Sequence, residues 1–513
     1  MINLFIRAFL CLLLLTSRHA FAAEPYSSIE ELIANQKLIR VVLDSGPNFG
    51  NQTSSINLMK RIEALGFHGT FEVIYPDDIT DKVITLFNLP KQIPSYYEYK
   101  NDDKGVIHFI NYTEYFNRLK NNQIPSITLS VTGALENDKM HGCLENKECA
   151  PYAFDHKFAE FSNSQLFLAM NPWFTSATSP EDTAADYIYT WNAAPKEISS
   201  KGTYWIYPHA DYDQAKNYLN SHPELTTEKP ALKPLIAAID AKTINVLPVY
   251  GYEILKYDYD YGNFPANIIQ IITGARYAQL HGASDYNKPL VITVYYNYEK
   301  EANELMQFIS AANTNNHSEN PGLESMKETI KTLGLNQPNV FSVATISDPA
   351  TINKIKQLKS GQILLISMGS LPNTVFDGLY TYIANNIWPQ IREGQNTLNN
   401  LLLTGKPHFR CREQWEPRLD LITDTSLKTR LEDFYTMGQN AKPGFCSGIN
   451  SWTNNDKVYQ NFGELLISSN DTNSSFSRYF ADLKIDAMKP KNDRIHFALE
   501  EVLKLVNEKQ LSK

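Results

Sequence analysis

The chain has 513 residues, enough for several domains of average size. Its composition, 43% hydrophobic and 20% charged, is typical of a globular protein and excludes a collagen-like, coiled-coil or disordered chain. The 47 basic and 56 acidic residues give a net charge of −9 without a long run of like charge. This balance disfavours nucleic acid and anionic membrane surfaces as partners, because both are bound through clustered basic residues.

The first 22 residues have the pattern of a secretory signal. Arg7 supplies the positive flank, Ala8–Thr16 the apolar stretch, and Ala20-Phe21-Ala22 a cleavage site of small residues. The apolar stretch is nine residues long, whereas a membrane-spanning helix needs about 20. We therefore expect a cleaved signal peptide (residues 1–22), a secreted or periplasmic protein, and no stable membrane anchor.

Four cysteines remain after cleavage, and an even number in an exported chain suggests disulfides. They are Cys143, Cys149, Cys411 and Cys446. Of the three possible pairings, the simplest joins Cys143 to Cys149 and Cys411 to Cys446. A zinc site is a weaker alternative because no pair has CxxC spacing. Four free thiols are the expectation if the protein meets no oxidant.

The N-terminal half begins with a β-α-β pattern. An apolar strand, Leu38–Leu43, is followed by a small polar loop, 44–52, and then by a helix with apolar residues at three- and four-residue steps. Gly66 stands where a helix stop is expected, and Thr70–Tyr75 reads as a second strand. Such a unit begins a doubly wound sheet.

Three more apolar segments of this half predict strands: Ile127–Val131, Gln165–Ala169 and Asn245–Val249. Residues 90–115 and 141–162 are polar and rich in aromatic side chains, and we interpret them as insertions. These elements assign residues 23–280 to an N-terminal Rossmann-like domain.

A second α/β region begins near residue 288. Its predicted strands are Pro289–Tyr296, Val340–Ala344 and Ile363–Ile366, and its predicted helices are Glu299–Ile309 and Ala350–Leu358. The tail from Asp482 has a helical pattern. We therefore expect a second Rossmann-like domain at 281–450 and a C-terminal helical tail at 451–513.

Two segments of the second region carry candidate ligand-binding residues. Gly369 and Ser370 follow a predicted strand, where small residues let a ligand approach the backbone. Farther along, Glu393 can accept hydrogen bonds from two hydroxyl groups, as a ribose presents them. Gly394 is a turn, and the residues after it place backbone N–H groups at a positive helix end that suits an anion.

This second segment is where a resemblance to a known family appears. The pattern Arg392-Glu393-Gly394-x-Asn396-Thr397, with Gly405-Lys406-Pro407 after it, resembles the donor-nucleotide segment of GT-B glycosyltransferases. The resemblance implies an α/β fold with two Rossmann-like domains facing a cleft and a C-terminal helical tail. It also implies donor-binding roles for Gly369, Ser370, Arg392, Glu393, Gly394, Asn396 and Thr397.

The loop after the first strand is similar to the first N-terminal loop of these enzymes, which faces the cleft. The cleft residues expected here are Asn48, Gly50, Asn51 and Gln52. The histidine that commonly acts in this loop is absent. Asp44 is the candidate general base in its place, although it also fits a role in ordering the loop.

The predicted activity is that of an exported glycosyltransferase, which moves a sugar from a nucleotide-sugar donor to an acceptor hydroxyl or side chain. No cofactor is expected, and His141, His281 and His408 show no metal-ligand spacing. Helix N-termini, with Arg392 or Lys406, would stabilise the leaving diphosphate. Such an enzyme has to work where its donor exists, because activated sugars are not expected outside the cytoplasm.

Blander interpretations stay open. Gly394 and Gly405 stand at helix boundaries in many α/β proteins, and Asn396 or Thr397 can simply cap a helix. The alternative function is a two-lobed periplasmic or extracellular solute-binding protein without catalysis, which needs no donor. Such proteins usually cross between lobes two or three times. Here the halves read as sequential, with one crossing near residue 280 and a return at the tail.

Overall fold

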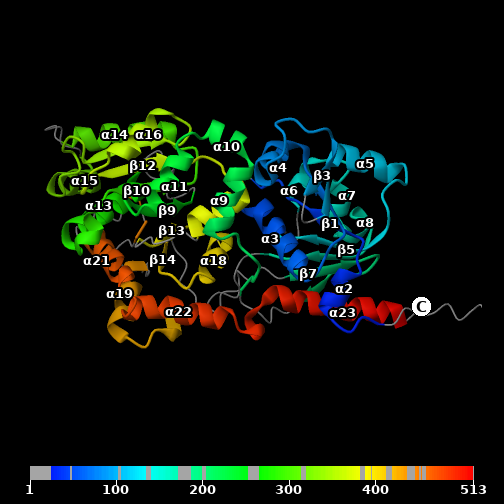
Figure 1. The fold of residues 1–513 in the computed structure, drawn as a ribbon. Helices are drawn as coiled ribbons and strands as arrows, with labels where there is room; N and C mark the ends of the chain where they lie inside the picture. Colours follow the sequence, from blue (N-terminus) through cyan, green and yellow to red (C-terminus); the bar gives the residue numbers. More distant parts are fainter. Residues whose placement is uncertain are drawn as a thin grey trace, which may run out of the picture. The chain divides into compact units, whose positions relative to one another are not determined.

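The protein is described from a computed structural model (Figure 1). It describes residues 25–46, 49–101, 105–134, 140–171, 186–198, 204–251, 265–312, 319–381, 388–393, 395–411, 419–435, 445–446, 448–449, 452 and 458–511. The chain divides into two compact units. The first unit comprises Met1–Lys82, Pro90–Pro208 and Pro490–Lys513, and the second comprises Val83–Leu89 and His209–Lys489.

The first unit is built on an eight-stranded sheet of order β3-β4-β2-β1-β5-β6-β7-β8. Its strands are β1 (Leu38–Val42), β2 (Thr70–Tyr75), β3 (Tyr96–Asn101), β4 (Gly105–Asn111), β5 (Ile127–Thr132), β6 (Ser164–Ala169), β7 (Asp186–Thr190) and β8 (Lys196–Ile198). The five strands from β4 to β6 run parallel, whereas β3, β7 and β8 pair antiparallel at the two edges. This is the predicted doubly wound arrangement.

Helices accompany the strands of this unit, and they are α2 (Ile29–Ala34), α3 (Gly50–Ala64), α4 (Thr80–Phe87, which runs into the second unit), α5 (Tyr112–Lys120), α6 (His141–Glu145), α7 (Ala150–Phe154), α8 (Phe158–Phe161) and α23 (Arg494–Leu511). The predicted β-α-β unit is confirmed as β1, α3 and β2. Gly66 follows α3 with a φ of +94°, a left-handed conformation that a glycine adopts without strain.

The interpretation of residues 90–115 as an insertion is wrong. β4 pairs parallel with β2 along its length, and β3 covers β4 as an antiparallel edge strand. The sequence of β3 is rich in tyrosine and charge because an edge strand needs apolar side chains on one face only. Residues 141–162 hold the short helices α6, α7 and α8 rather than strands.

The second unit is built on a six-stranded, fully parallel sheet of order β11-β12-β10-β9-β13-β14. Its strands are β9 (Asn245–Tyr250), β10 (Leu290–Val294), β11 (Phe341–Thr345), β12 (Ile363–Ser367), β13 (Gln390–Arg392) and β14 (His408–Arg410). Its helices are α9 (Tyr212–Ser221), α10 (Pro223–Glu228), α11 (Leu232–Asp240), α13 (Ala266–His281), α14 (Glu299–Ala311), α15 (Pro321–Thr332), α16 (Ala350–Gln357), α17 (Asn373–Phe376), α18 (Gln395–Leu402), α19 (Thr425–Tyr435), α21 (Val458–Asn470) and α22 (Ser475–Ala487).

The predicted domain boundary at residue 280 is wrong. β9 and α13 were expected in the N-terminal domain, yet β9 lies at the centre of the second sheet between β10 and β13. The second unit therefore starts at His209, apart from the short piece Val83–Leu89. An apolar strand such as β9 pairs equally well with either sheet, so its own residues do not show where it belongs.

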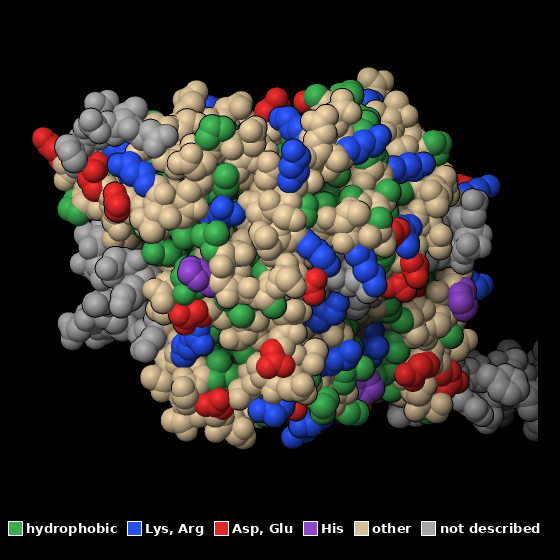
Figure 2. All heavy atoms as spheres, turned by 60° about the vertical axis from the view of Figure 1, so that its left-hand side comes forward, with side chains coloured by type: hydrophobic (Ala, Val, Ile, Leu, Met, Phe, Trp, Pro, Cys, Tyr) green, Lys and Arg blue, Asp and Glu red, His purple; other side chains and the backbone are tan. Residues whose placement is uncertain are grey.

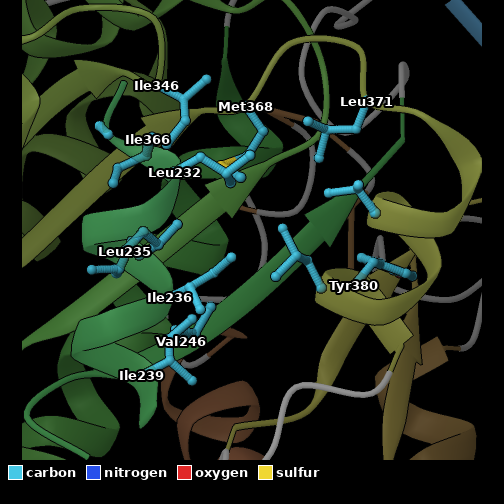
Figure 3. Packing of buried hydrophobic residues seen from close by; sticks show 14 of the residues in the cluster. Leu232, Leu235, Ile236, Ile239, Val246, Ile346, Ile366, Met368, Leu371 and Tyr380 are labelled. Atoms are coloured by element: carbon cyan, nitrogen blue, oxygen red, sulfur yellow. The ribbon is translucent and has the colours of Figure 1, made fainter. Parts of the chain in front are cut away.

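One hydrophobic core of the second unit lies between α11 and the sheet (Figure 3). Apolar side chains recur on α11 at three- and four-residue steps, so they share one face of the helix. They are Leu232, Leu235, Ile236 and Ile239, each no more than 8% exposed. They pack with Val246 of β9 and Ile366 of β12, which anchors the helix on the sheet.

The tail at 451–513 is helical but is not a single unit. α21 and α22 belong to the second unit, and α23 belongs to the first. The predicted return of the chain at the tail is thus confirmed. Arg494 holds α23 in the first unit through a buried ion pair with Asp186 of β7, with Nε–Oδ2 and Nη2–Oδ1 distances of 2.6 Å each.

Both predicted disulfides are present. Cys143 and Cys149 join α6 to the start of α7 with Cα atoms 4.8 Å apart, and Cys411 and Cys446 have Cα atoms 5.2 Å apart. The second bridge closes a separation of 35 residues, which stabilises the folded state by about 4 kcal/mol in the chain-entropy model.

The surface carries charges of both signs. On the face drawn in Figure 2, Lys and Arg side chains lie among Asp and Glu side chains. None of the described helices is long and apolar enough to cross a membrane.

Candidate sites at the carboxyl edges of two parallel sheets

Each sheet has a point at which the strand order reverses. In the first sheet, the chain builds outward from β1 through β2 and then continues on the other side with β5. In the second sheet, it builds from β9 through β10 and then continues on the other side with β13. Ligands of doubly wound sheets bind outside the carboxyl ends of the strands at such points. The predicted site residues lie near these two reversal points or away from them, as described below for each sheet.

Asp44 lies at the reversal point of the first sheet, two residues after β1. Its carboxylate is 1% exposed and accepts hydrogen bonds from the Ser45 backbone N–H at 2.9 Å and from Asn51 Nδ2 at 3.2 Å. Gln52, on the first turn of α3, donates from Nε2 to the carbonyl oxygens of Asp44 and Gly46, the latter at 3.5 Å. The loop between β1 and α3 is thus closed by its own polar side chains.

Close backbone packing supports this loop. A Cβ at Gly133, just after β5, would collide with the backbone of Ser54 in α3. The Ser55 hydroxyl accepts a hydrogen bond from the Gly133 N–H at 2.9 Å. Lys82 donates from Nζ to the Gly46 carbonyl at 2.5 Å. Burial lowers the pKa of Lys82, and the nearby charges of Asp78 and Asp44 oppose that shift.

The other predicted cleft residues contribute less. Gly50 begins α3, and a Cβ there would meet nothing within 4 Å. Asn48 lies outside the described residues. With its carboxylate buried and engaged by Ser45 and Asn51, Asp44 is suited to ordering the loop. This geometry gives no support to its prediction as a general base.

Glu393 lies at the reversal point of the second sheet. It directly follows β13, and its backbone N–H donates to the Tyr250 carbonyl at the end of β9, at 2.9 Å. Its side chain is half-buried. Burial, with a smaller contribution from the Glu393 charge, raises the pKa of Tyr250 to about 12. The predicted ribose-binding carboxylate thus lies where this fold class places its ligands.

Arg392 is fully buried, at 0% exposure, and its side chain shares a face of the sheet with Gln390 and His408. Burial, followed by the Arg392 charge, holds the pKa of His408 well below its usual value. The predicted direct contact between Arg392 and a diphosphate is not supported by this burial. The guanidinium is instead a positive charge beneath the site.

The segment after Glu393 forms the predicted helix, α18. Thr397 lies in its first turn and is 5% exposed. Asn396 belongs to the helix, although its side chain and Gly394 lie outside the described residues. Farther along α18, Asn400 Nδ2 donates to Asp377 Oδ1 at 3.2 Å.

The predicted role of Gly405-Lys406-Pro407 in gripping the nucleotide is wrong. Because β13 and β14 are parallel, α18 carries the chain back to the amino edge of the sheet before β14 begins. These three residues therefore lie at the edge opposite to Glu393. Gly405, with a φ of +66°, ends the helix there beside Lys484 of α22.

Gly369 and Ser370 follow β12 at the same carboxyl edge as Glu393. Gly369 has a φ of +60°, and Ser370 is exposed. Lys229, between α10 and α11, lies against this turn and donates from Nζ to the Met368 carbonyl at 3.0 Å. Sequence reasoning missed Lys229, because a single lysine between helices belongs to no recognisable motif.

Aromatic side chains occupy the edge beside Glu393, and they also escaped the sequence analysis. Tyr250 contacts Phe376 and Tyr380 with ring centroids 5.2 and 6.0 Å apart, and Tyr295 contacts the same two rings. Among the described residues, no group of three or more His, Cys, Asp or Glu is placed to hold a metal ion.

These observations define an α/β protein with two doubly wound, mainly parallel sheets and further C-terminal helices. No protein-family model matches the chain, and no curated protein matches it. Two solved structures resemble it in fold, both of α,α-trehalose-phosphate synthases (UDP-forming). That from Burkholderia xenovorans, in complex with glucose-6-phosphate, has 8% identity and a TM-score of 0.33 over 93% of this chain and 100% of its own. That from Burkholderia vietnamiensis has 9% identity and a TM-score of 0.31 over 92% and 98%.

Proposed function

We propose that the protein is an exported glycosyltransferase of the GT-B kind. It would move a sugar from a nucleotide-sugar donor to an acceptor hydroxyl or side chain without a metal ion. The second unit would bind the donor, and the first unit would face the acceptor.

The position of Glu393 carries the proposal. Glu393 is half-buried at the reversal point of a parallel sheet, and the hydrogen bond from its N–H to the Tyr250 carbonyl fixes its backbone there. A carboxylate can accept two hydrogen bonds from the vicinal hydroxyl groups of a ribose. α18 begins two residues later, so its positive end lies beside the same edge.

The proposal divides the chemistry between binding and leaving-group stabilisation. The start of α18 and the buried charge of Arg392 favour a negative diphosphate near Glu393. Asp44 orders the loop of the first unit, and we assign no general base.

Export, the signal peptide at 1–22 and a secreted or periplasmic location belong to the proposal, and the two disulfides support an oxidising compartment. The enzyme would then act where nucleotide sugars are supplied, such as a host or secretory compartment.

The test is calorimetric titration of the protein with a panel of nucleoside diphosphates, on wild type and Glu393→Gln. Replacing the carboxylate removes charge-assisted hydrogen bonds, so affinity should fall by about ten- to a hundred-fold. The free energy of unfolding should change by about 1 kcal/mol or less, because an acid near a helix start contributes little through the dipole.

Glu299→Gln is the matched control, since Glu299 is an exposed acid at the start of α14 in the same unit. It should leave nucleotide affinity unchanged. If wild type binds no nucleoside diphosphate but binds a free sugar or peptide, the transferase proposal fails and solute binding takes its place.

A further inference from the structure

Lys229 is anchored at the carboxyl edge of the second sheet by its own backbone. Its N–H donates to the Leu225 carbonyl at 2.9 Å, and its carbonyl accepts from the Leu232 N–H at 3.0 Å. Two residues later, the Ala231 N–H donates to the Ile346 carbonyl at the end of β11, at 3.2 Å. The side chain therefore starts from a fixed point beside the strand ends.

The ammonium group of Lys229 is directed at the turn after β12. Nζ donates to the Met368 carbonyl, and it lies 3.1 Å from the position that a Cβ of Gly369 would occupy. A side chain at residue 369 would press on the ammonium, and its φ of +60° also suits glycine. The turn and the lysine thus fit each other.

Among the described residues, this ammonium group has no counter-ion. Within the described part of the chain, no carboxylate lies at ion-pair distance from Lys229, although the side chain is half-buried. Burial lowers its pKa, and the charge of neighbouring Glu228 opposes that shift. A half-buried lysine with two N–H groups left after its bond to Met368 is favourably placed to receive an anion.

We propose that Lys229, the Gly369 turn and Ser370 form a phosphate-binding subsite at the carboxyl end of β12. The ammonium group donates to phosphate oxygens, the missing Cβ of Gly369 leaves room for that ammonium beside the turn, and the exposed Ser370 hydroxyl donates a further hydrogen bond. The ligand is a diphosphate or a phosphate monoester.

This subsite deepens the proposed function by adding a second contact for one elongated ligand. β12 and β13 are separated by β10 and β9, so the Gly369 turn and Glu393 lie three strand spacings apart, about 14 Å. A monosaccharide is too short to span this distance, whereas an extended sugar nucleotide approaches it. The ribose would lie at Glu393, the diphosphate would begin beside the start of α18, and its far phosphate or a sugar phosphate would extend toward Lys229.

Inorganic pyrophosphate is the probe for the first experiment, in calorimetric titrations of wild type, Lys229→Met and Lys233→Met. Loss of charge-assisted hydrogen bonds should weaken pyrophosphate binding by about ten- to a hundred-fold in Lys229→Met. Lys233 is an exposed lysine on α11, and its replacement should have no effect. Equal affinity in wild type and Lys229→Met, or no binding of pyrophosphate to wild type, overturns the subsite.

Amine labelling followed by mass spectrometry gives a second measurement that does not depend on a variant. Pyrophosphate should protect Lys229 from an acylating reagent and leave Lys233 labelled. Labelling of Lys229 at the same rate with and without pyrophosphate contradicts the proposal.

Titrations with a nucleoside diphosphate and with a hexose phosphate distinguish the source of the phosphate. They also separate this inference from the proposed function. A nucleoside diphosphate whose affinity falls both in Lys229→Met and in Glu393→Gln supports a nucleotide ligand at this subsite. A hexose phosphate whose affinity falls in Lys229→Met but not in Glu393→Gln also supports the subsite. If no nucleoside diphosphate loses affinity in Glu393→Gln, the proposed function is contradicted. If nucleotide affinity falls in Glu393→Gln but not in Lys229→Met, the subsite is overturned and the proposed function stands.

Discussion

At the scale of single residues, the second unit keeps a histidine in its interior. His408 of β14 is 1% exposed, its ring lies 4.5 Å from that of Phe480, and its Nδ1 is 3.2 Å from the Lys406 carbonyl. A neutral ring with its proton on Nδ1 can donate to that carbonyl. Burial and the charge of Arg392 both oppose a second proton, so the pKa of His408 lies well below its usual value.

We expect this histidine to make the second unit labile to acid. Below about pH 6.5 the His408 ring is protonated in the unfolded chain but stays neutral in the folded chain. The free energy of unfolding therefore falls as the pH falls. The loss should reach up to about 2 kcal/mol between pH 6.5 and 5. Urea unfolding of wild type and His408→Asn across this range measures it, since the variant should lose this part of the slope.

His281→Asn serves as the control, because His281 is exposed at the end of α13. Its pH slope should match that of wild type. Identical slopes in wild type and His408→Asn would show that the buried ring does not cause the acid lability.

The sequence predicted some site residues and missed others for identifiable reasons. Glu393 became a candidate from the sequence because it stands between a short strand and a helix start, a pattern that local sequence carries. Lys229 and Tyr250 were missed because the sheet topology alone brings them to the same edge. The error over Gly405-Lys406-Pro407 has the same origin, since a motif shows the order of its residues but not which edge of the sheet they reach.

At the scale of elements, the crossing of α13 and α21 depends on two glycines. A Cβ at Gly274 would collide with the ring of Phe462, and a Cβ at Gly463 would lie 2.9 Å from the Gly274 carbonyl oxygen. The missing side chains let the two helices pack backbone against backbone. The sequence did not predict that these two helices pair, because α13 was expected in the other domain. The sequence predicted strands and helices where their periodicity is strong. It did not predict how they group into domains.

Gly274→Ala should therefore destabilise the second unit although alanine favours helices. The added methyl group has to displace Phe462, and overpacking of this kind costs about 1–3 kcal/mol. Gly50→Ala is the matched control, because the same methyl group enters open space at the start of α3. Denaturant unfolding should show a loss for Gly274→Ala and a change within about 1 kcal/mol for Gly50→Ala. Equal effects of the two substitutions would refute the close crossing.

At the scale of the whole molecule, the chain leaves the first unit at Pro208 and returns to it at Pro490. α23 is held there at several points. Directly before the helix, Asp493 Oδ2 accepts from Arg61 Nη2 at 2.8 Å, and within it the Asn507 side chain exchanges hydrogen bonds with the backbone of Tyr26 at 3.0 and 2.9 Å. The last helix in the sequence is thus part of the unit that folds around the first strand. The helical pattern of the tail was readable from sequence, but its attachment depends on partners several hundred residues away.

The buried pair between Arg494 and Asp186 should decide whether α23 stays attached. Both side chains are at most 2% exposed, and the Asn171 N–H donates to the same carboxylate at 2.9 Å. Arg494→Met leaves this carboxylate without its cation, and breaking a buried pair in this way costs about 3–5 kcal/mol. Lys196→Met is the control, because the Lys196–Glu501 pair also joins α23 to the first unit but is partly exposed, and such pairs are worth about 0.2–1 kcal/mol. Hydrogen exchange should accelerate in α23, β6 and β7 of Arg494→Met and stay unchanged in β10 and β12. Acceleration in both units alike, or in neither, would show that α23 does not stabilise the first unit through this pair.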